Sequence, residues 1–319
     1  MPKKHLLLAL KFFVSFGVIF VLLNTMNTDT LMDIITSAKI DMVLWAAVVV
    51  AIQVLAATSR WHTVIIAINS VLSYGRCLWL YTIGLFFNQL LPSSVGGDAV
   101  RIYKAYKSGL TLKSSVHSVM LERAATMLGL VVVFVLTLPK FLTDNNYSDV
   151  PISTALISLL VLGTIVGVII LTHLHLLPTK LRSWKLLKLL IDLSSDARKL
   201  FLTPKHLSLV MLWSILGHVF IALKVYFLAL AVGIDASFVE CTVVTVMVLL
   251  VMMLPISIAG WGVREGAMVG SFGLIGVPAE SALAASLLFG MLGIIQAIPG
   301  AIIWLKQDPE TKETPPQSL

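Results

Sequence analysis

Six apolar runs divide this chain into segments long enough to cross a membrane. A helix needs about 20 consecutive apolar residues to span a hydrocarbon core about 30 Å thick. The runs lie at about 6–23, 42–58, 116–138, 152–171, 207–232 and 280–304. Only 12% of the 319 residues are charged and 58% are hydrophobic, which argues against a soluble fold. We therefore expect an all-α polytopic membrane protein with about six full spans.

The N-terminal apolar run, 6–23, resembles a signal sequence because it follows the basic segment MPKKH. The run is about 18 residues long and no A-x-A-like cleavage site follows it, so we interpret it as an uncleaved first span.

A short motif occurs twice in this apolar chain. Residues 91–101 read LPSSVGGDAVR and residues 254–264 read LPISIAGWGVR, and six of the eleven positions are identical. Proline ends an incoming helix, serine caps an outgoing one, and glycine lets the backbone approach a ligand. Non-helical backbone is tolerated at membrane depth only beside protein or a water-filled cavity. We expect two re-entrant helical hairpins, at about 77–113 and 239–278.

The basic residues give the chain an orientation, because cytoplasmic loops retain lysine and arginine. With the N-terminus inside, the inner segments hold seventeen basic residues, Arg60 and Arg101 among them, and the outer segments hold only Lys39 and Lys140. The C-terminus is then also inside. The first hairpin enters from the cytoplasm and the second from outside, which predicts an inverted-topology repeat whose broken helices meet near the midplane.

The whole of 1–305 is expected to form a single transmembrane domain. Its long connection, 180–202, has a basic face and an apolar face at helical spacing. This pattern predicts an amphipathic helix on the inner leaflet, and an ordinary positively charged linker explains it equally well. The polar tail 306–319 is expected to be disordered and cytoplasmic.

Each motif combines a helix N-terminus with an arginine, Arg101 or Arg264, and both features favour a phosphate group. Asp98 and Glu265 lie beside these arginines. Four unpaired charges inside a membrane cost on the order of 10 to 14 kcal/mol, so these groups must pair, meet water or bind a ligand. The candidate lipid-headgroup residues are Pro92, Ser94, Gly96, Gly97, Asp98, Arg101, Gly260, Gly262, Arg264 and Glu265.

Other polar residues inside the apolar runs have less specific interpretations. Glu122 and Arg123 are candidates for gating or ion pairing, and Glu122 is a candidate partner for a hairpin arginine. Lys11 and Lys224 lie near expected span ends, from which lysine can extend to the interface. We expect His218 to be a hydrogen-bonded core residue.

No cofactor or metal is expected. His173 and His175 lie near a span end without a convincing ligand set, and Cys77 and Cys241 lack zinc or disulfide spacing. Gly266, Gly270 and Gly273 recur at helical spacing, which predicts close packing of the second return helix against a neighbour.

Three longer stretches carry a family resemblance. They are FFNQLLPSSVGGDAVRIYKAY, VMLERAATMLGLVVVF and LPISIAGWGVREGAMVGSFGLIGVPAESALAASLLF. Together they resemble the flippase-like transmembrane region of lysylphosphatidylglycerol synthases, over about residues 5–305. The motifs PxxxGGDxxR and GxGxREG carry this resemblance. The matching positions are Pro92, Gly96, Gly97, Asp98, Arg101, Glu122, Arg123, Gly260, Gly262, Arg264 and Glu265.

The resemblance implies movement of a lipid between leaflets, with related members linked to polyprenyl-phosphate or hopanoid handling. The soluble domain that transfers the amino acid is expected to be missing, because few residues follow the last run. Synthesis of a lysyl-lipid is therefore not expected.

The first hypothesis is a lipid flippase or transporter of the plasma (cell inner) membrane, with a phospholipid or a polyprenyl-phosphate-like lipid as its partner. The anionic or zwitterionic lipid would move through a midplane cavity formed by the two opposed re-entrant hairpins. No nucleotide-binding motif is present, so an ion gradient or no energy source would accompany it. Two non-enzymatic alternatives are a partner subunit of a lipid pathway and a small-anion transporter. A lipid-modifying acyltransferase is the enzymatic alternative, suggested by His117 and Glu122.

Macromolecular partners follow from the same pattern. Basic residues spread over short loops argue against a nucleic-acid partner. A homo-oligomer and a separate lipid-synthesising enzyme are the protein partners that we consider.

Overall fold

The computed structural model describes residues 17–91, 96–144, 151–176, 185–253 and 259–306, and within these ranges all regular structure is helical. The elements in chain order are α2 (Thr28–Thr36), α3 (Ile40–Ala67), α4 (Tyr74–Leu90), α5 (Gly96–Lys107), α6 (Leu112–Asp144), α7 (Pro151–His173), η1 (Leu174–Leu176), α8 (Lys185–Phe201), α9 (Pro204–Ala231), α10 (Phe238–Met252), α11 (Val263–Gly273) and α12 (Ala279–Leu305). The predicted all-α class is confirmed.

Among the described residues, 4 helices are long and apolar enough to cross a membrane: α3, α6, α9 and α12. The helix Gly17–Thr25 and α2 count as a fifth span only if they are taken as one helix bent by 97°. Most of the expected first run, 6–23, lies outside the described residues. The exact number of full spans therefore stays a prediction.

Helix starts follow local capping chemistry. Asn27 accepts hydrogen bonds from the amides of Asp29 and Thr30 at the start of α2. Ser237 and Glu240 form a reciprocal capping box at the start of α10, in which each side chain accepts from the other residue's amide. These caps satisfy amides that have no partner inside their own helix.

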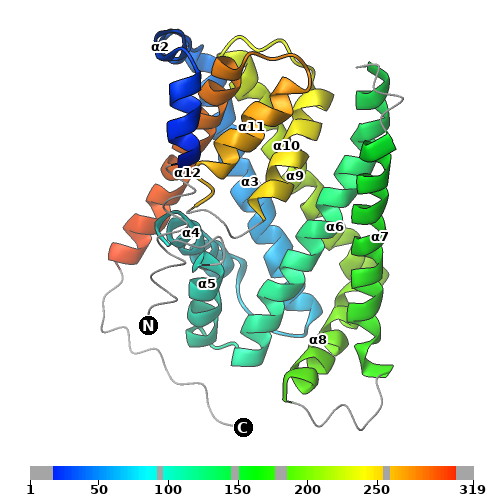
Figure 1. The fold of residues 1–319 in the computed structure, drawn as a ribbon. Coiled ribbons are helices and arrows are strands. Elements are labelled where there is room, and N and C mark those ends of the chain that lie inside the picture. Colours follow the sequence, from blue (N-terminus) through cyan, green and yellow to red (C-terminus); the bar gives the residue numbers. More distant parts are fainter. Residues whose placement is uncertain (1–16, 92–95, 145–150, 177–184, 254–258, 307–319) are drawn as a thin grey trace.

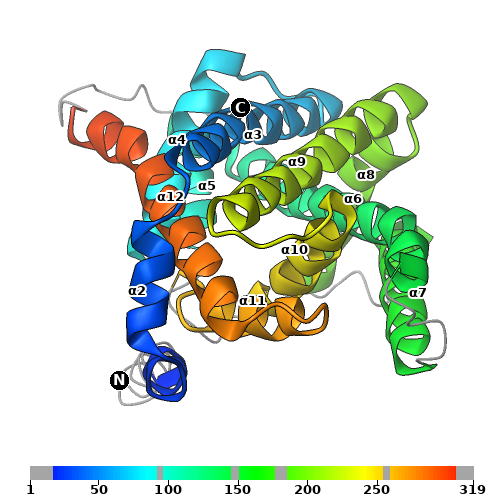
Figure 2. The ribbon, with the colours of Figure 1, turned by 90° about the horizontal axis from the view of Figure 1, so that it is seen from above.

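The centre of the molecule is the antiparallel pair of α3 and α9. The amide of Lys39, just before α3, donates to the carbonyl of Ala231, the last residue of α9, at 2.9 Å. Seen from above, α9 lies between α3 and α10 (Figure 2). Helix α12 packs against α4, α9 and α11, and α6 packs against α9 and α10, so α9 contacts elements from both halves of the chain.

Each copy of the repeated motif separates two helices. Helices α4 and α5 pack together on either side of the first copy, and α10 and α11 pack together on either side of the second. In Figure 1, α5 lies in the lower half of the molecule, whereas α10 and α11 lie in the upper half. Residues 92–95 and 254–258 of the motifs lie outside the described residues. Re-entry into the bilayer from opposite faces remains a prediction.

The placement of Arg60 corrects one expectation. Arg60 is buried inside α3, which continues for two further turns beyond the expected span end at residue 58. The expectation failed because Arg60 has a carboxylate partner in the fold and needs no loop. Arg101 is also buried, so neither arginine contributes to a cytoplasmic loop.

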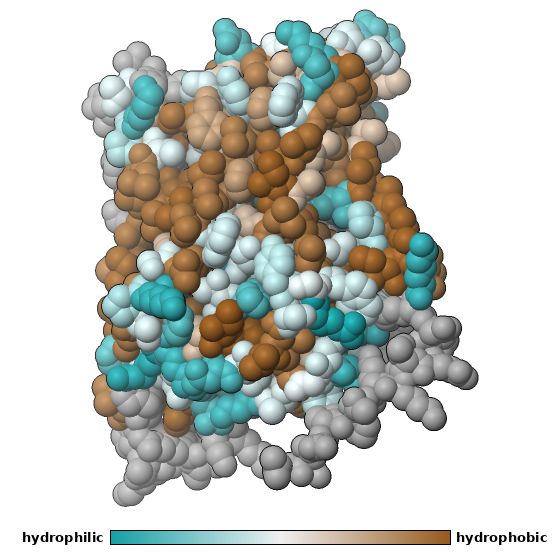
Figure 3. All heavy atoms as spheres, turned by 180° about the vertical axis from the view of Figure 1, so that it is seen from behind, coloured by the Kyte–Doolittle hydropathy of each residue, from teal (hydrophilic) through white to brown (hydrophobic). Residues whose placement is uncertain are grey.

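The amphipathic helix α8 has part of its apolar face buried. Leu193, Ala197 and Phe201, on its apolar face, are buried in a cluster that includes Val64 and Leu121. These three side chains therefore pack on the protein, and the position of α8 at the inner leaflet stays a prediction. On the opposite face of the whole molecule from Figure 1, hydrophobic side chains form a band across the middle, and hydrophilic ones gather at the top edge and in the lower part (Figure 3).

The closest helix contacts occur at other glycines than those expected. A Cβ at Gly270 or Gly273 would meet no described atom, and one at Gly266 would only reach ordinary van der Waals contact with Val18. Instead, a Cβ at Gly97 of α5 would overlap the carbonyl of Gly84 in α4. A Cβ at Gly300 of α12 would overlap the carbonyl of Thr82. These two glycines let α5 and α12 approach α4 closely.

Candidate functional site

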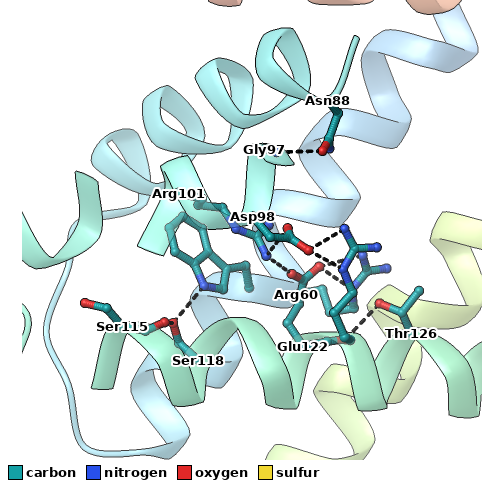
Figure 4. Close-up of polar contacts among 11 residues, drawn as sticks. Arg60, Asn88, Gly97, Asp98, Arg101, Ser115, Ser118, Glu122 and Thr126 are labelled. Atoms are coloured by element: carbon teal, nitrogen blue, oxygen red, sulfur yellow. Dashed lines mark hydrogen bonds and ion pairs between the residues drawn. The ribbon is translucent and has the colours of Figure 1, made fainter. Parts of the chain in front are cut away.

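Five charged side chains from three helices meet beside the first motif, and we call them the first cluster. The cluster consists of Arg60 from α3, Asp98 and Arg101 from α5, and Glu122 and Arg123 from α6. The expectation that Glu122 pairs with a hairpin arginine is confirmed in the geometry. Figure 4 shows the side chains of Arg60, Asp98, Arg101 and Glu122 pointing toward one another from three helices.

Glu122 is the centre of the first cluster, and it is only 2% exposed. Its Oε1 accepts from Arg60 Nε at 3.2 Å and Nη2 at 2.7 Å, while its Oε2 pairs with Arg101. Asp98 Oδ1 lies 3.3 Å from Arg101 Nη2, and Asp98 Oδ2 lies 2.7 Å from both Arg123 Nε and Nη2. Two carboxylates thus form ion pairs with three guanidinium groups (Figure 4).

Aromatic rings enclose the Arg101 guanidinium. Its Cζ lies 4.6 Å from the ring centroid of Trp61 and 5.0 Å from that of Tyr81, close enough for cation–π attraction. Trp61 is fully buried, and its Nε1 donates to Ser118 Oγ at 3.1 Å. The ring that faces Arg101 is therefore held in place from α6.

One donor in the first cluster is unused. The buried Nε of Arg101 has no hydrogen-bond partner among the described residues. A pocket of about 20 Å³ lies beside it, lined by Tyr81, Gly84, Leu85, Asn88, Gly97, Asp98, Arg101 and Arg123. That volume holds about one water molecule. A buried donor without an acceptor costs about 1 to 3 kcal/mol, so it favours an added acceptor.

The start of α5 completes this side of the site. The backbone amide of Gly97 donates to Asn88 Oδ1 at 2.9 Å. The Asn88 side chain thus joins α4 to the first turn of α5. Asp98 lies in the same turn, where a carboxylate is favoured by the helix dipole. Asn88 is a contact residue that the sequence reading did not single out.

The second motif leads into a group that we call the second cluster: Lys224, Arg264 and Glu265. Arg264 and Glu265 are adjacent on α11 and form a buried ion pair. Oε1 of Glu265 forms the pair with Arg264 and also accepts from Ser286 Oγ at 3.4 Å. Oε2 of Glu265 accepts from the Gly262 amide at 2.6 Å. Each of these contacts fixes the start of α11.

The turn into α11 explains the glycines of the second motif. Gly260 and Gly262 have φ values of 83° and 80°, in the left-handed region that glycine adopts without steric cost. Ala259 has a φ of 51°, so the turn uses this region at a non-glycine residue as well. The backbone therefore reverses sharply before the helix begins.

The placement of Lys224 is a second correction. Lys224 was expected to extend to the interface, but it is only 5% exposed and its Nζ lies 3.1 Å from the ring centroid of Phe289. Arg264 also faces aromatic rings, with its Cζ 4.5 Å from Trp261 and 5.7 Å from Phe289. No described carboxylate forms an ion pair with Lys224. Lys11 lies outside the described residues.

The candidate residues from the sequence fall into two separate sets. The structure joins Asp98, Arg101, Glu122 and Arg123, and it joins Arg264 with Glu265 and the Gly262 amide. Gly96 begins α5, and Pro92 and Ser94 lie outside the described residues. No hydrogen bond or ion pair of the described residues connects the two clusters. A shared midplane cavity stays a prediction.

The residues suggested for acyltransferase chemistry do not face one another. His117 Nδ1 contacts Asp196 Oδ2 of α8 at 2.7 Å, whereas Glu122 binds Arg60 and Arg101. Five positions along an α-helix place side chains on different faces. His117 is instead part of the contact between α6 and α8.

The other expectations concern core residues and metals. His218 is buried and its Nδ1 donates to the Ser214 carbonyl at 2.7 Å, as expected. Cys77 and Cys241 are buried and free. Within the described part of the chain, no group of three or more His, Cys, Asp or Glu residues is arranged to hold a metal.

The fold and these buried ion networks define a multi-pass integral membrane protein. The chain belongs to the family described as the lysylphosphatidylglycerol synthase TM region, whose model matches residues 8–300. It is also similar to the UPF0104 membrane protein PH1989 of Pyrococcus horikoshii, with 23% identity over 330 aligned residues. That alignment covers 95% of this chain and 97% of the relative. The family links the chain to lipid metabolism.

Proposed function

We propose that this protein moves an anionic or zwitterionic lipid, such as a phospholipid or a polyprenyl phosphate, between the leaflets of the plasma (inner) membrane. One observation carries the proposal: each cluster contains one more cation than it has carboxylates among the described residues, and all of these charged side chains except the half-exposed Arg123 are buried. The first cluster has Arg60, Arg101 and Arg123 against Asp98 and Glu122. The second has two cations, Lys224 and Arg264, against one carboxylate, Glu265.

The motif tips cannot supply the missing negative charge. Residues 92–95 read PSSV and residues 254–258 read LPISI, and neither segment contains an acidic residue. An excess charge is costly inside a membrane unless a counter-ion or water accompanies it. A phosphate group that enters either cluster removes that cost, whereas a cationic ligand increases it.

Arg101 is the residue that we propose as the main headgroup contact in the first cluster. Its planar guanidinium can form two parallel hydrogen bonds to phosphate oxygens, and its Nε is still available. Gly96 and Gly97 at the start of α5 would lie along the same approach. We propose Pro92 and Ser94 as further headgroup contacts. Asp98, Glu122 and Arg123 would regulate access through their ion pairs.

Entry of a headgroup requires movement. The pocket beside Arg101 has a volume of about 20 Å³, whereas binding sites for small molecules occupy about 300 to 1,000 Å³. The described arrangement is therefore a closed one. We propose that the first motif moves away from α6 to admit the headgroup, and that the second cluster, with Gly260, Gly262, Arg264 and Glu265, receives it nearer the other leaflet.

The test is lipid translocation in proteoliposomes. The probes are phosphatidylglycerol, phosphatidylethanolamine and a polyprenyl phosphate, each with a fluorescent label that an external reductant quenches. We expect movement of at least one probe by the native protein and its loss in Arg101→Gln and in Arg264→Gln. The matched control is Lys205→Gln, which removes an exposed positive charge at the start of α9 and should leave the rate unchanged.

The outcomes separate the alternatives. Equal rates in all variants would refute the assignment of the headgroup site. Uptake of inorganic phosphate without lipid movement would support the small-anion transporter. No movement of any probe, with a stoichiometric partner copurifying, would support the partner subunit. Size-exclusion profiles of each variant show whether the protein is folded.

A further inference from the structure

An apolar groove lies between α3, α4 and α12, apart from both clusters. Its volume is about 520 Å³, within the range of binding sites for small molecules. The groove is lined by Ala47, Val50, Ala51, Val54, Gly75, Leu78, Trp79, Thr82, Leu85, Leu292, Ile295, Gln296, Pro299 and Ile303. None of these residues is charged. Ala51 and Ile295 are exposed, so the groove opens on the outer surface of the helix bundle.

Helix α4 separates this groove from the first cluster. Gly75, Leu78, Thr82 and other residues at helical spacing face the groove. Tyr81, Gly84 and Asn88 line the charged pocket on another side of the same helix. Leu85 borders both spaces. One helix of 17 residues thus has a hydrocarbon-like environment on one side and an anion-binding environment on the other.

We propose that the groove binds one hydrocarbon chain of the lipid whose phosphate group meets the first cluster. The proposal rests on the proposed function for the identity of the headgroup, but the groove has its own geometry. Charge complementarity assigns the two parts of an anionic lipid: the cluster has an excess positive charge and the groove has none. A lipid that spans the end of α4 reaches both.

The size of the groove argues against a protein helix as its occupant. On α12 the lining extends from Leu292 to Ile303, which is about 16 Å at 1.5 Å per residue. A helix of that length and about 10 Å in diameter occupies about 1,200 Å³. This is more than the whole empty space of the groove, about 1,110 Å³ with its open side included. Close contact of Gly300 with Thr82 also joins α12 to α4 beside the groove. A single hydrocarbon chain is narrower and fits.

The polar atoms of the groove are compatible with hydrocarbon. Gln296 Nε2 donates to Gln53 Oε1 at 3.4 Å, which pairs one donor with one acceptor across α12 and α3. Thr82 Oγ1 donates to the Leu78 carbonyl at 2.7 Å within α4. These two hydrogen bonds reduce the number of free polar groups in the groove.

The test is photo-crosslinking in liposomes, and it requires no transport. The probe is phosphatidylglycerol with a diazirine in the middle of one acyl chain, and mass spectrometry locates the labelled residues. We expect labels on the groove-facing residues of α3 and α12. Ala51→Trp, which fills the groove, should reduce that labelling by at least about tenfold, the equivalent of about 1.4 kcal/mol in binding. Val48→Trp is the control, because Val48 is exposed on α3 and does not line the groove.

The results distinguish this proposal from the proposed function. Equal labelling of groove residues and of Val48, or no effect of Ala51→Trp, would refute the proposal that the groove binds a hydrocarbon chain. Cysteine crosslinks between groove residues of two copies would overturn it as well. If a diacylglycerol probe labels the groove equally, the groove binds a hydrocarbon chain, but the first cluster does not select an anionic headgroup. Size-exclusion chromatography checks that both tryptophan variants are folded.

Discussion

The two clusters use similar residues in different ways. In the first, Glu122 and Asp98 pair with arginines from α3, α5 and α6, so the ion pairs join three helices. In the second, Arg264 and Glu265 are adjacent on α11, and Lys224 of α9 lies over the ring of Phe289 and pairs with no described carboxylate. The first cluster therefore stabilises the tertiary structure, whereas the second organises one helix start and leaves an ammonium group in the interior.

The difference depends on one acidic residue. Both motifs contain an arginine at the same position of the repeat, Arg101 or Arg264. Helix α6 presents Glu122 to the first arginine, and in the second cluster the partner is the neighbouring Glu265. Similar motifs can thus produce a rigid, shared network in one half of the chain and a local one in the other.

Loss of the shared carboxylate should have the largest effect. Glu122→Gln keeps the size of the side chain but leaves Arg60 without its carboxylate and Arg101 with only Asp98. Breaking a buried ion pair by removing one partner costs about 3 to 5 kcal/mol, and we expect a loss of that size in the free energy of unfolding. Denaturant unfolding in detergent measures it.

The control for Glu122→Gln is Asp192→Asn, which breaks the exposed pair of Asp192 with Lys113. Exposed ion pairs contribute about 0 to 1 kcal/mol, so this variant should be close to native. Similar losses in the two variants would contradict the tertiary role of Glu122.

A pair of glycine substitutions compares the two regions directly. In Gly97→Ala the new Cβ would overlap the backbone of Gly84 and force α4 and α5 apart, which should cost about 1 to 3 kcal/mol. In Gly290→Ala the Cβ would mainly meet the end of the Arg264 side chain, which can move. We expect the smaller loss there.

Thermal unfolding of the two alanine variants, with Gly75→Ala as a control, tests this order. A Cβ at Gly75 meets no described atom, and alanine favours helix by up to about 1 kcal/mol. A larger loss for Gly290→Ala than for Gly97→Ala would show that Arg264 is the more rigid of the two contacts.

Removal of the second cluster's ammonium should stabilise the protein. Lys224→Met retains much of the apolar stem and removes a buried charge that has no described carboxylate partner. We expect a gain on the order of 1 kcal/mol in the free energy of unfolding, together with slower lipid movement. Denaturant unfolding and the translocation assay provide the two measurements, and Arg101→Met, which should destabilise, is the comparison. A large loss of stability in Lys224→Met would refute the contrast between the clusters.

The smallest effect concerns a polar contact outside both clusters, at Asp196 of α8. Burial alone would raise the pKa of this carboxyl, but hydrogen bonds from His117 and Lys199 outweigh it, and the pKa lies below its ordinary value. A carboxylate with a lowered pKa stabilises the fold above its unfolded pKa of about 3.9 and loses that effect as the pH falls further. The stability difference between the native protein and Asp196→Asn should be constant above about pH 5 and shrink below about pH 4. Thermal unfolding from pH 3 to pH 7 measures it, and a difference that grows in acid would contradict it.

Much of the fold was readable from the apolar runs. The runs at 116–138 and 280–304 fall within α6 and α12, and the run at 207–232 ends one residue beyond α9, because continuous apolar sequence of that length has few alternatives in a membrane. The repeated motif also located the breaks between α4 and α5 and between α10 and α11. Helix α2 was missed, since its sequence TDTLMDIIT is short and polar enough to resemble a loop.

The site was only half predictable. The arginines of the motifs and Glu122 stood out because charge inside an apolar run is costly. Arg60 was missed because its run appeared to end at residue 58, although the sequence WHTVIIA after it continues the helix. Lys224 was misjudged because side-chain direction depends on the packing of α9 against α12, which one sequence does not reveal.

Because Glu122 is shared by Arg60 and Arg101, it also affects how fast a bound headgroup leaves. Arg101 already has carboxylates on two helices, so an arriving phosphate would accept from the free Nε and would exchange with Glu122 at Nη2. Glu122 would retain Arg60 during that exchange and would remain close enough to compete for Arg101 again. The intramolecular competitor has a high effective concentration, and it would shorten the residence time of every headgroup. A protein that must release its ligand on each cycle benefits from such an intramolecular competitor.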